Sequence, residues 1–110
     1  MTDFKEKCIR EVQTIAEQIN ELGISDNYEE LDKYFDDVLD VEYRIASDGS
    51  YKGVYIYLSL GGPNIWVDTM SRTVELRWGT DLASALLCDE AIVRIDETFE
   101  ELYRCIRENS

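Results

Sequence analysis

Three pairs of adjacent carboxylates are the side chains in this sequence best suited to acid–base chemistry. Such chemistry needs two carboxylates that share a cleft and have pKa values shifted in opposite directions. These pairs instead lie in stretches with a helical apolar period, away from the apolar stripe, so we expect them to face water. They are Asp36-Asp37, Asp96-Glu97 and Glu100-Glu101.

Metal and nucleophile chemistry has little support in the composition. The chain has no histidine, which removes Ser/His and Cys/His relays and the usual general base near neutral pH. There is no calcium-loop motif. The three cysteines form no CxxC pair, and Cys8 and Cys105 fit small buried hydrophobic positions, with a redox role as the alternative for Cys8, Cys88 and Cys105. We expect no enzyme activity, no cofactor and no dedicated metal site.

The segment GGPN at 61–64 separates two apolar runs. It lacks the lysine and the following helix of a phosphate-binding loop. Pro63 fixes φ, Gly62 tolerates the restricted position before proline, and Asn64 accepts turn conformations. The segment therefore predicts a hairpin turn rather than a ligand-binding loop.

Helical periodicity marks both ends of the chain. Residues 3–22 predict a long helix closed by Gly23, and the good N-caps at 25–27 predict a short second helix. A last helix should run from Asp89 to about residue 107. The expected apolar stripes are Phe4, Cys8, Val12, Ile15, Ile19 and Leu22; then Leu31, Tyr34, Phe35, Val38 and Leu39; then Ile92, Ile95, Phe99, Leu102 and Ile106.

Between the helices the period changes from 3.6 to 2, which predicts strands at 41–45, 51–60, 65–69 and 73–79, with a short edge strand at 83–87. Short connections make these an antiparallel meander. The alternation turns Val54, Ile56, Leu58, Leu60, Ile65, Val67, Val74, Leu76 and Trp78 inward. The other face would carry Tyr55, Tyr57, Ser59 and Trp66 among Arg44, Asp68, Glu75 and Arg77.

The predicted fold is α+β, in the order α-α-β-β-β-β-(β)-α, as one domain over residues 1–110. It has an antiparallel sheet of four to five strands. Each helix has one apolar stripe, so the N-terminal helices and the C-terminal helix can all pack on one face of the sheet. The other face is then open, which antiparallel sheets tolerate.

The formal net charge of −13 is unevenly distributed. Residues 26–42 carry −7 and residues 81–101 carry −6, whereas residues 43–80 carry +1. Direct binding to nucleic-acid phosphate is disfavoured by repulsion, while a basic protein partner is compatible with this charge. The sequence has no apolar run long enough to cross a bilayer and no secretory signal, so we expect a cytoplasmic protein with no membrane association.

Three stretches, GGPNIWVDT, VELRWGTD and IDETFEELY, resemble a group of small acidic proteins of gut Firmicutes. These look like accessory genes of integrative and conjugative elements. The resemblance spans nearly the whole chain and implies a bacterial origin and an association with mobile DNA. It brings no catalytic residue.

Two functions follow from these patterns. The first is a protein–protein interaction module, with a homodimer as one option, that uses Tyr55, Tyr57, Trp66 and Arg77 on the sheet face; the alternative for these aromatics is cross-strand pairing that only stabilises the sheet. The second is an acidic DNA mimic that inhibits a host restriction or CRISPR nuclease. Its surface would be Asp32, Asp36, Asp37, Glu97, Glu100 and Glu101.

Overall fold

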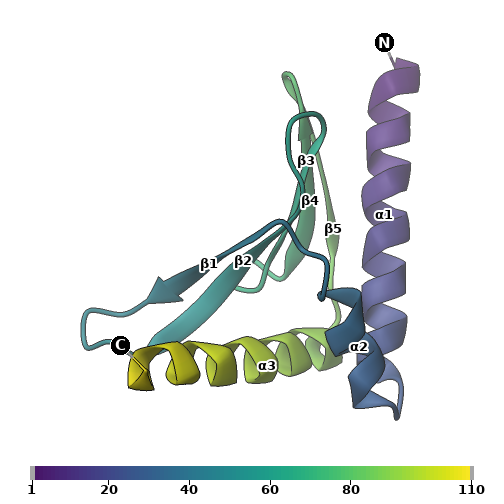
Figure 1. The fold of residues 1–110 in the computed structure, drawn as a ribbon. Helices are drawn as coiled ribbons and strands as arrows, with labels where there is room; N and C mark the ends of the chain where they lie inside the picture. The colour runs from purple at the N-terminus through teal and green to yellow at the C-terminus, as the bar shows by residue number, and fades with distance from the viewer. Residues whose placement is uncertain (1, 110) are drawn as a thin grey trace.

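Five strands form one antiparallel sheet in which neighbours in sequence are neighbours in space (Figure 1). The structure is a computed structural model that describes residues 2–109. The strands are β1 (Asp40–Ile45), β2 (Tyr51–Ser59), β3 (Asn64–Asp68), β4 (Thr73–Trp78) and β5 (Asp81–Leu86). The predicted α+β class, the meander and the fifth strand are confirmed.

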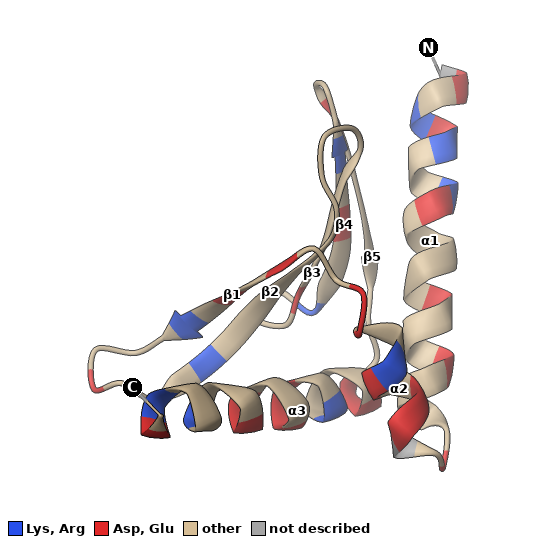
Figure 2. Ribbon diagram, viewed as in Figure 1, with Lys and Arg blue, Asp and Glu red and all other residues tan. Residues whose placement is uncertain are grey.

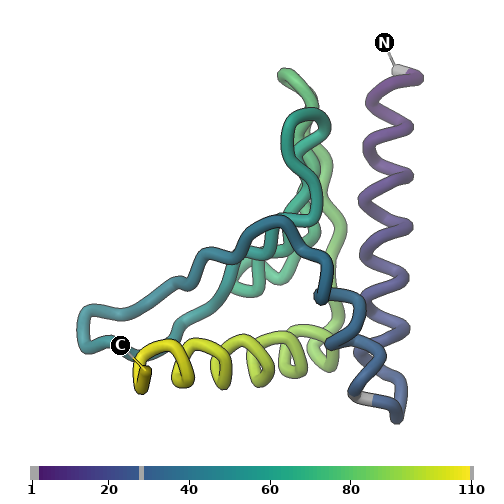
Figure 3. The backbone as a smooth tube through the Cα atoms, in the orientation of Figure 1, coloured from purple at the N-terminus to yellow at the C-terminus, as the bar shows by residue number. Residues whose placement is uncertain are grey.

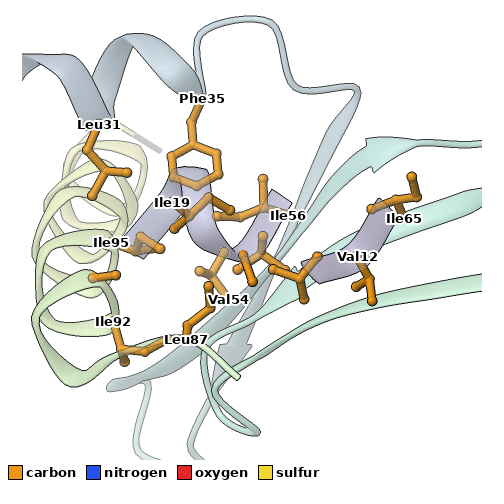
Figure 4. Close-up of a cluster of buried hydrophobic side chains, with 14 of the residues drawn as sticks. Val12, Ile19, Leu31, Phe35, Val54, Ile56, Ile65, Leu87, Ile92 and Ile95 are labelled. Atoms are coloured by element: carbon orange, nitrogen blue, oxygen red, sulfur yellow. The ribbon is translucent and has the colours of Figure 1, made fainter. Parts of the chain in front are cut away.

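Both long helices pack on the same face of this sheet. The inward side chains Val54, Ile56, Val67, Val74 and Leu76 are buried, and together with buried residues of the helices they form one core (Figure 4). Helix α1 (Thr2–Ile24) lies along β4 and β5, and α3 (Asp89–Glu108) lies against β2. In Figure 3 the β1–β2 hairpin turns away from the direction of β3, β4 and β5, so that each helix covers a different part of the sheet.

Helix α1 is held by an apolar stripe at helical spacing. Cys8, Val12, Ala16 and Ile19 are all buried. The sequence predicted that Gly23 closes this helix. This prediction is wrong, because the helix continues through Gly23 to Ile24. A Cβ placed on Gly23 would lie 2.6 Å from both Cα and Cβ of Ala91. The glycine is therefore explained by the close crossing of α1 and α3.

The short helix α2 (Tyr28–Tyr34) follows α1 in the chain and packs against both long helices. The Asn27 side chain caps it by accepting a 3.1 Å hydrogen bond from the Glu29 amide. Leu31 and Phe35 are buried, and the Phe35 ring meets the Phe99 ring edge to face, with centroids 6.0 Å apart. Leu39 is exposed, because the helix has ended five residues earlier and no longer sets its direction.

The C-terminal half of α3 departs from the predicted stripe. Ile92, Ile95 and Phe99 are buried, but Leu102 and Ile106 are 47% and 56% exposed. Here α3 faces the β1–β2 hairpin through Tyr103 and Arg107, which both donate 2.9 Å hydrogen bonds to the Gly49 carbonyl. The contact line has moved to the adjacent side chains of the helix, which leaves Leu102 and Ile106 at the surface.

The GGPN segment is a turn, as predicted. Gly61 and Gly62 have φ values of 104° and 143°, which favour glycine, and the Gly62–Pro63 peptide bond is cis. The Asn64 side chain accepts a 3.0 Å hydrogen bond from the Gly61 amide. Just before the turn the register with β3 shifts between Tyr57 and Ser59, so Ser59 lies opposite the inward residue Ile65. This irregularity ends the simple alternation and leaves Leu60 exposed rather than inward.

The α1–α3 crossing predicts the effect of Gly23→Ala. In an isolated helix this change is favourable by about 1 kcal/mol. Here the added methyl group meets backbone atoms of Ala91, so we expect a loss of about 1–3 kcal/mol in unfolding free energy, measured by chemical denaturation. Glu21→Ala, on the exposed side of the same helix, is the control and should be close to neutral. A more stable Gly23→Ala variant would contradict the crossing.

Candidate functional site: the open face of the sheet

The sheet face opposite the helices carries the three predicted aromatics side by side. Tyr57 lies directly opposite Trp66 in the β2–β3 register, and Tyr55 lies two residues along β2 from Tyr57. All three are partly exposed. The three aromatics are accessible because none of the three helices packs on this face. They lie near its centre because β2 and β3 are inner strands of the sheet.

Charged groups of β1 pack against these aromatics. The Arg44 guanidinium lies 4.0 Å from the centroid of the Tyr55 ring, a cation–π geometry. The Tyr57 hydroxyl donates a 3.0 Å hydrogen bond to Glu42 Oε1. Partial burial, together with this bond to a carboxylate, raises the pKa of Tyr57. The ring therefore presents an apolar surface with its hydroxyl already oriented.

Arg77, the fourth predicted site residue, is exposed on the same face. In the register it lies opposite Asn64 on β3 and Leu82 on β5. Glu75 lies opposite Trp66. Arginine and glutamate thus stand on the β4 side of the aromatic centre, as Arg44 and Glu42 do on the β1 side.

Asp68 was expected among the exposed polar groups of this face, but it is buried. Its Oδ1 atom accepts hydrogen bonds from the amides of Met70 (3.0 Å) and Ser71 (3.4 Å). The carboxylate therefore holds the β3–β4 turn, a common role for aspartate directly before a turn. It is structural and not available to a partner.

The apolar part of the open face extends further than the alternation pattern of β2 and β3 indicates. The Met70 side chain lies over Gly53, where a Cβ would come within 2.6 Å of Met70 Cγ. Leu82 and Leu86 on β5 are both strongly exposed. The face continues to them because β5 pairs with β4 in regular register, Thr73 opposite Leu86. Alternation across 81–86 could have identified these leucines once that segment was treated as a full strand.

The acids of the alternative hypothesis come from α2, the connection that follows it, and α3. The Thr98 hydroxyl of α3 donates a 2.9 Å hydrogen bond to Asp32 Oδ1 of α2, so these helices touch (Figure 2). Arg104 pairs with Glu100 at 3.1 Å and with Glu101 at 3.2 Å, which partly neutralises them. All six predicted acids are exposed except Glu100, which is intermediate: Asp32, Asp36, Asp37, Glu97, Glu100 and Glu101.

A cleft of about 440 Å³ lies between the β1–β2 turn and the C-terminal half of α3, which touch beside it. Tyr51 at its edge donates a 2.7 Å hydrogen bond to Asp96 Oδ1, and its ring neighbours Tyr103. Burial and the bond to the Asp96 carboxylate raise the pKa of Tyr51 far above its usual value. These contacts tie the hairpin to the helix and hold Tyr51 in its protonated form at neutral pH.

The described part of the chain, residues 2–109, has no group of three or more metal-ligating side chains of His, Cys, Asp or Glu. Cys8 is buried, as expected, but Cys105 is exposed, because it lies on the outer side of α3. Within the same residues, no helix combines the length and apolar character needed to cross a bilayer.

Comparisons with protein-family models, with curated proteins and with solved structures find no match to this chain.

The Tyr51–Asp96 contact predicts a pH dependence. Tyr51→Phe should cost about 1 kcal/mol of unfolding free energy at pH 7, because it removes one partly exposed hydrogen bond. Because the pKa of Tyr51 is higher in the folded than in the unfolded protein, the tyrosine stabilises the fold fully below the unfolded pKa of about 10. This stabilisation is lost as the pH rises above about 10, where the unfolded chain loses its proton first. Denaturation of both proteins should therefore show a difference that is constant from pH 7 to 9 and shrinks above pH 10. A constant difference up to pH 11 would contradict the raised pKa.

Proposed function

We propose that this protein is a non-enzymatic protein–protein interaction module that binds its partner through the open face of the sheet. The observation that carries the proposal is the direct pairing of Tyr57 with Trp66 at the centre of a face that none of the helices covers. Aromatic side chains near the middle of an interface often carry most of its binding energy.

The surroundings of the aromatic pair support this function. Interfaces commonly have an apolar centre and a polar rim. Here Tyr55 and Met70 add apolar surface, and Arg44 and Arg77 supply charge at the margins. Arginine is enriched in interfaces because its guanidinium can both stack and donate several hydrogen bonds.

The charge distribution also favours the open face for contact. Residues 43–80, which contain β2, β3 and β4, carry a net charge of +1 in a chain of −13. A protein partner that contacts this part of the molecule meets much less charge than it would meet at the acidic helices. The resemblance to accessory proteins of mobile elements suggests that the partner belongs to such an element or to its bacterial host.

A second candidate is the acidic DNA mimic, directed at a restriction or CRISPR nuclease. One observation favours it: α2 and α3 touch through Asp32 and Thr98, so the two acidic segments belong to one connected region of the surface. Duplex DNA presents about one charge per 1.7 Å of its axis, and acids along helices at 1.5 Å per residue can follow part of such a row.

The interaction module predicts the loss of specific partners from Trp66→Ala and Tyr57→Ala variants. Tagged wild-type and variant proteins would be used for affinity capture from extracts of the bacterium that encodes the protein. Loss of a central aromatic anchor costs about 2 kcal/mol, or roughly a thirtyfold weaker complex. Leu102→Ala removes an exposed apolar side chain on α3 and is the matched control.

Circular dichroism and thermal melting establish that the variants are folded before capture. If an aromatic variant unfolds, Arg77→Glu replaces it as the test of this face, because it changes only an exposed charge there. The proposal requires proteins that the wild type and Leu102→Ala retain and that the face variants lose. Identical captured proteins for all variants would refute it.

The mimic hypothesis is tested by one variant in which Asp36, Asp37, Glu97 and Glu101 are changed together to Asn or Gln. The melting temperature should stay the same or rise, because like charges on a helix repel modestly. A DNA-handling target should be released, while Trp66→Ala should retain it. Its binding should also weaken steeply between low and moderate salt. A failure to capture any nuclease at low salt would exclude the mimic.

A further inference from the structure

Strand β5 is an edge strand with few of the features that usually prevent pairing with another chain; α1 packs beside it and bonds to its backbone at the C-terminal end, through Asn20 and Leu86. All six of its residues pair in register with β4, without a bulge. Edges are normally protected by charged residues, prolines or bulges. In a sequence with 32% charged residues, β5 (DLASAL) has one charge, at Asp81. The opposite edge, β1, has three in the same length: Asp40, Glu42 and Arg44.

The backbone groups that β5 directs outward follow from one hydrogen bond. The Leu87 amide donates to the Arg72 carbonyl at 2.9 Å, so residue 87 faces β4. In an antiparallel pair, alternate residues face the partner strand. Ala85 and Ala83 therefore face β4, while the N–H and C=O groups of Leu82, Ser84 and Leu86 point away from the sheet. In agreement, the Leu86 carbonyl points to the Asn20 side chain of α1, from which it accepts a long 3.4 Å bond. A carbonyl oxygen has two lone pairs, so this one can also accept a bond from an added strand.

Apolar side chains lie at this edge on both sides of the sheet. Asn20 identifies the side of α1 that lies at the edge. By helical spacing Ile9 and Gln13 share that side, next to Glu17. Ile9 is 38% exposed. On the open face, Leu82 and Leu86 are 56% and 75% exposed. An additional strand would cover apolar surface on both of its own faces.

We propose that β5 pairs with β5 of a second copy of this chain, antiparallel about a two-fold axis at Ser84. The register that centres on Ser84 is self-complementary. It places Leu82 opposite Leu86 of the second copy, and the reverse, so that two leucine pairs form on the open face. The two Asp81 carboxylates lie at opposite ends of the paired strands, about 20 Å apart at 3.3 Å per residue. No like charges of β5 face each other, and the five-stranded sheets join into one.

This edge contact leaves the open faces of both copies free and extends each toward the other through Leu82 and Leu86. It does not rest on the proposed function, because Trp66 on β3 lies two strands away from β5 and Tyr57 on β2 lies three strands away. Each copy carries a charge of −13, so long-range repulsion opposes the dimer. Salt screens that repulsion. The dimer should therefore strengthen as salt rises, the opposite of a complex between the acidic helices and a basic partner.

The test is sedimentation equilibrium of the full chain at low and high salt. Ser84→Lys puts two ammonium groups face to face at the axis and should weaken dimerisation by about tenfold or more. Thr80→Lys in the exposed β4–β5 turn changes the net charge equally and is the control. Ser84→Pro removes an amide that points outward and should also dissociate the dimer without breaking the ladder with β4.

A cross-link tests the register itself. In the Cys105→Ser background, Ser84→Cys should form a disulfide-linked dimer on mild oxidation, because paired Cα atoms in such a ladder lie about 5.5 Å apart. Thr80→Cys should not. A monomer at all concentrations and salts, or equal dissociation by the two lysine variants, would overturn the proposal. A dimer that Trp66→Ala dissociates and Ser84→Lys does not would also overturn it, because the contact would then lie on the open face. If the protein is a monomer and Ser84→Lys loses a captured protein, the β5 edge binds that protein and not a second copy.

Discussion

All buried aliphatic side chains of the sheet project from one face, and the rest of the molecule depends on this constraint. Val54, Ile56, Val67, Val74 and Leu76 must leave water together, so every helix has to pack on the same side. The sheet bends between the β1–β2 hairpin and the other strands, and one helix cannot follow both parts. Two long helices cover them, and where these cross only glycine fits at position 23 against Ala91.

The same constraint separates the chemistry of the surface. With all helices on one side, the strongly acidic α2 and α3 lie there, and the nearly neutral strands present the other side to solvent. Aromatic side chains at the outward positions of β2 and β3 become the centre of that open face. A partner that binds the face and a partner that binds the acids would meet different parts of the molecule, with opposite responses to salt.

Regular alternation explains which parts of the fold the sequence could predict. Strand order, the single covered face and the positions of Tyr55, Tyr57, Trp66 and Arg77 follow from a period of two and short connections, and the structure confirms them. Helix α1 is similarly regular: Cys8, Val12 and Ile19 are buried as expected, the other expected residues are partly buried, and Ala16 is a buried position that the expected stripe omitted.

The errors occur where tertiary contacts override the local pattern. Gly23 resembled a helix-closing glycine, but the neighbouring helix explains it. Leu102, Ile106 and Cys105 lie on α3 where its contact with the hairpin changes to another side of the helix. Asp68 was assigned to the surface by alternation, although the turn that follows it buries its carboxylate. A single sequence contains no record of where helices cross or how a turn folds back, so these positions could not be derived from period alone.

If the open face is an interaction surface, water must reach Tyr55, Tyr57 and Trp66 in the free protein. Nuclear magnetic resonance with a soluble paramagnetic agent measures this directly, through the relaxation enhancement of each aromatic ring. We expect the strongest enhancement at the exposed Trp78, clear enhancement at these three partly exposed rings, and weak enhancement at the buried rings of Phe35 and Phe99. Protection of the three rings to the level of Phe99 would show that the face is covered and is not free to bind a partner.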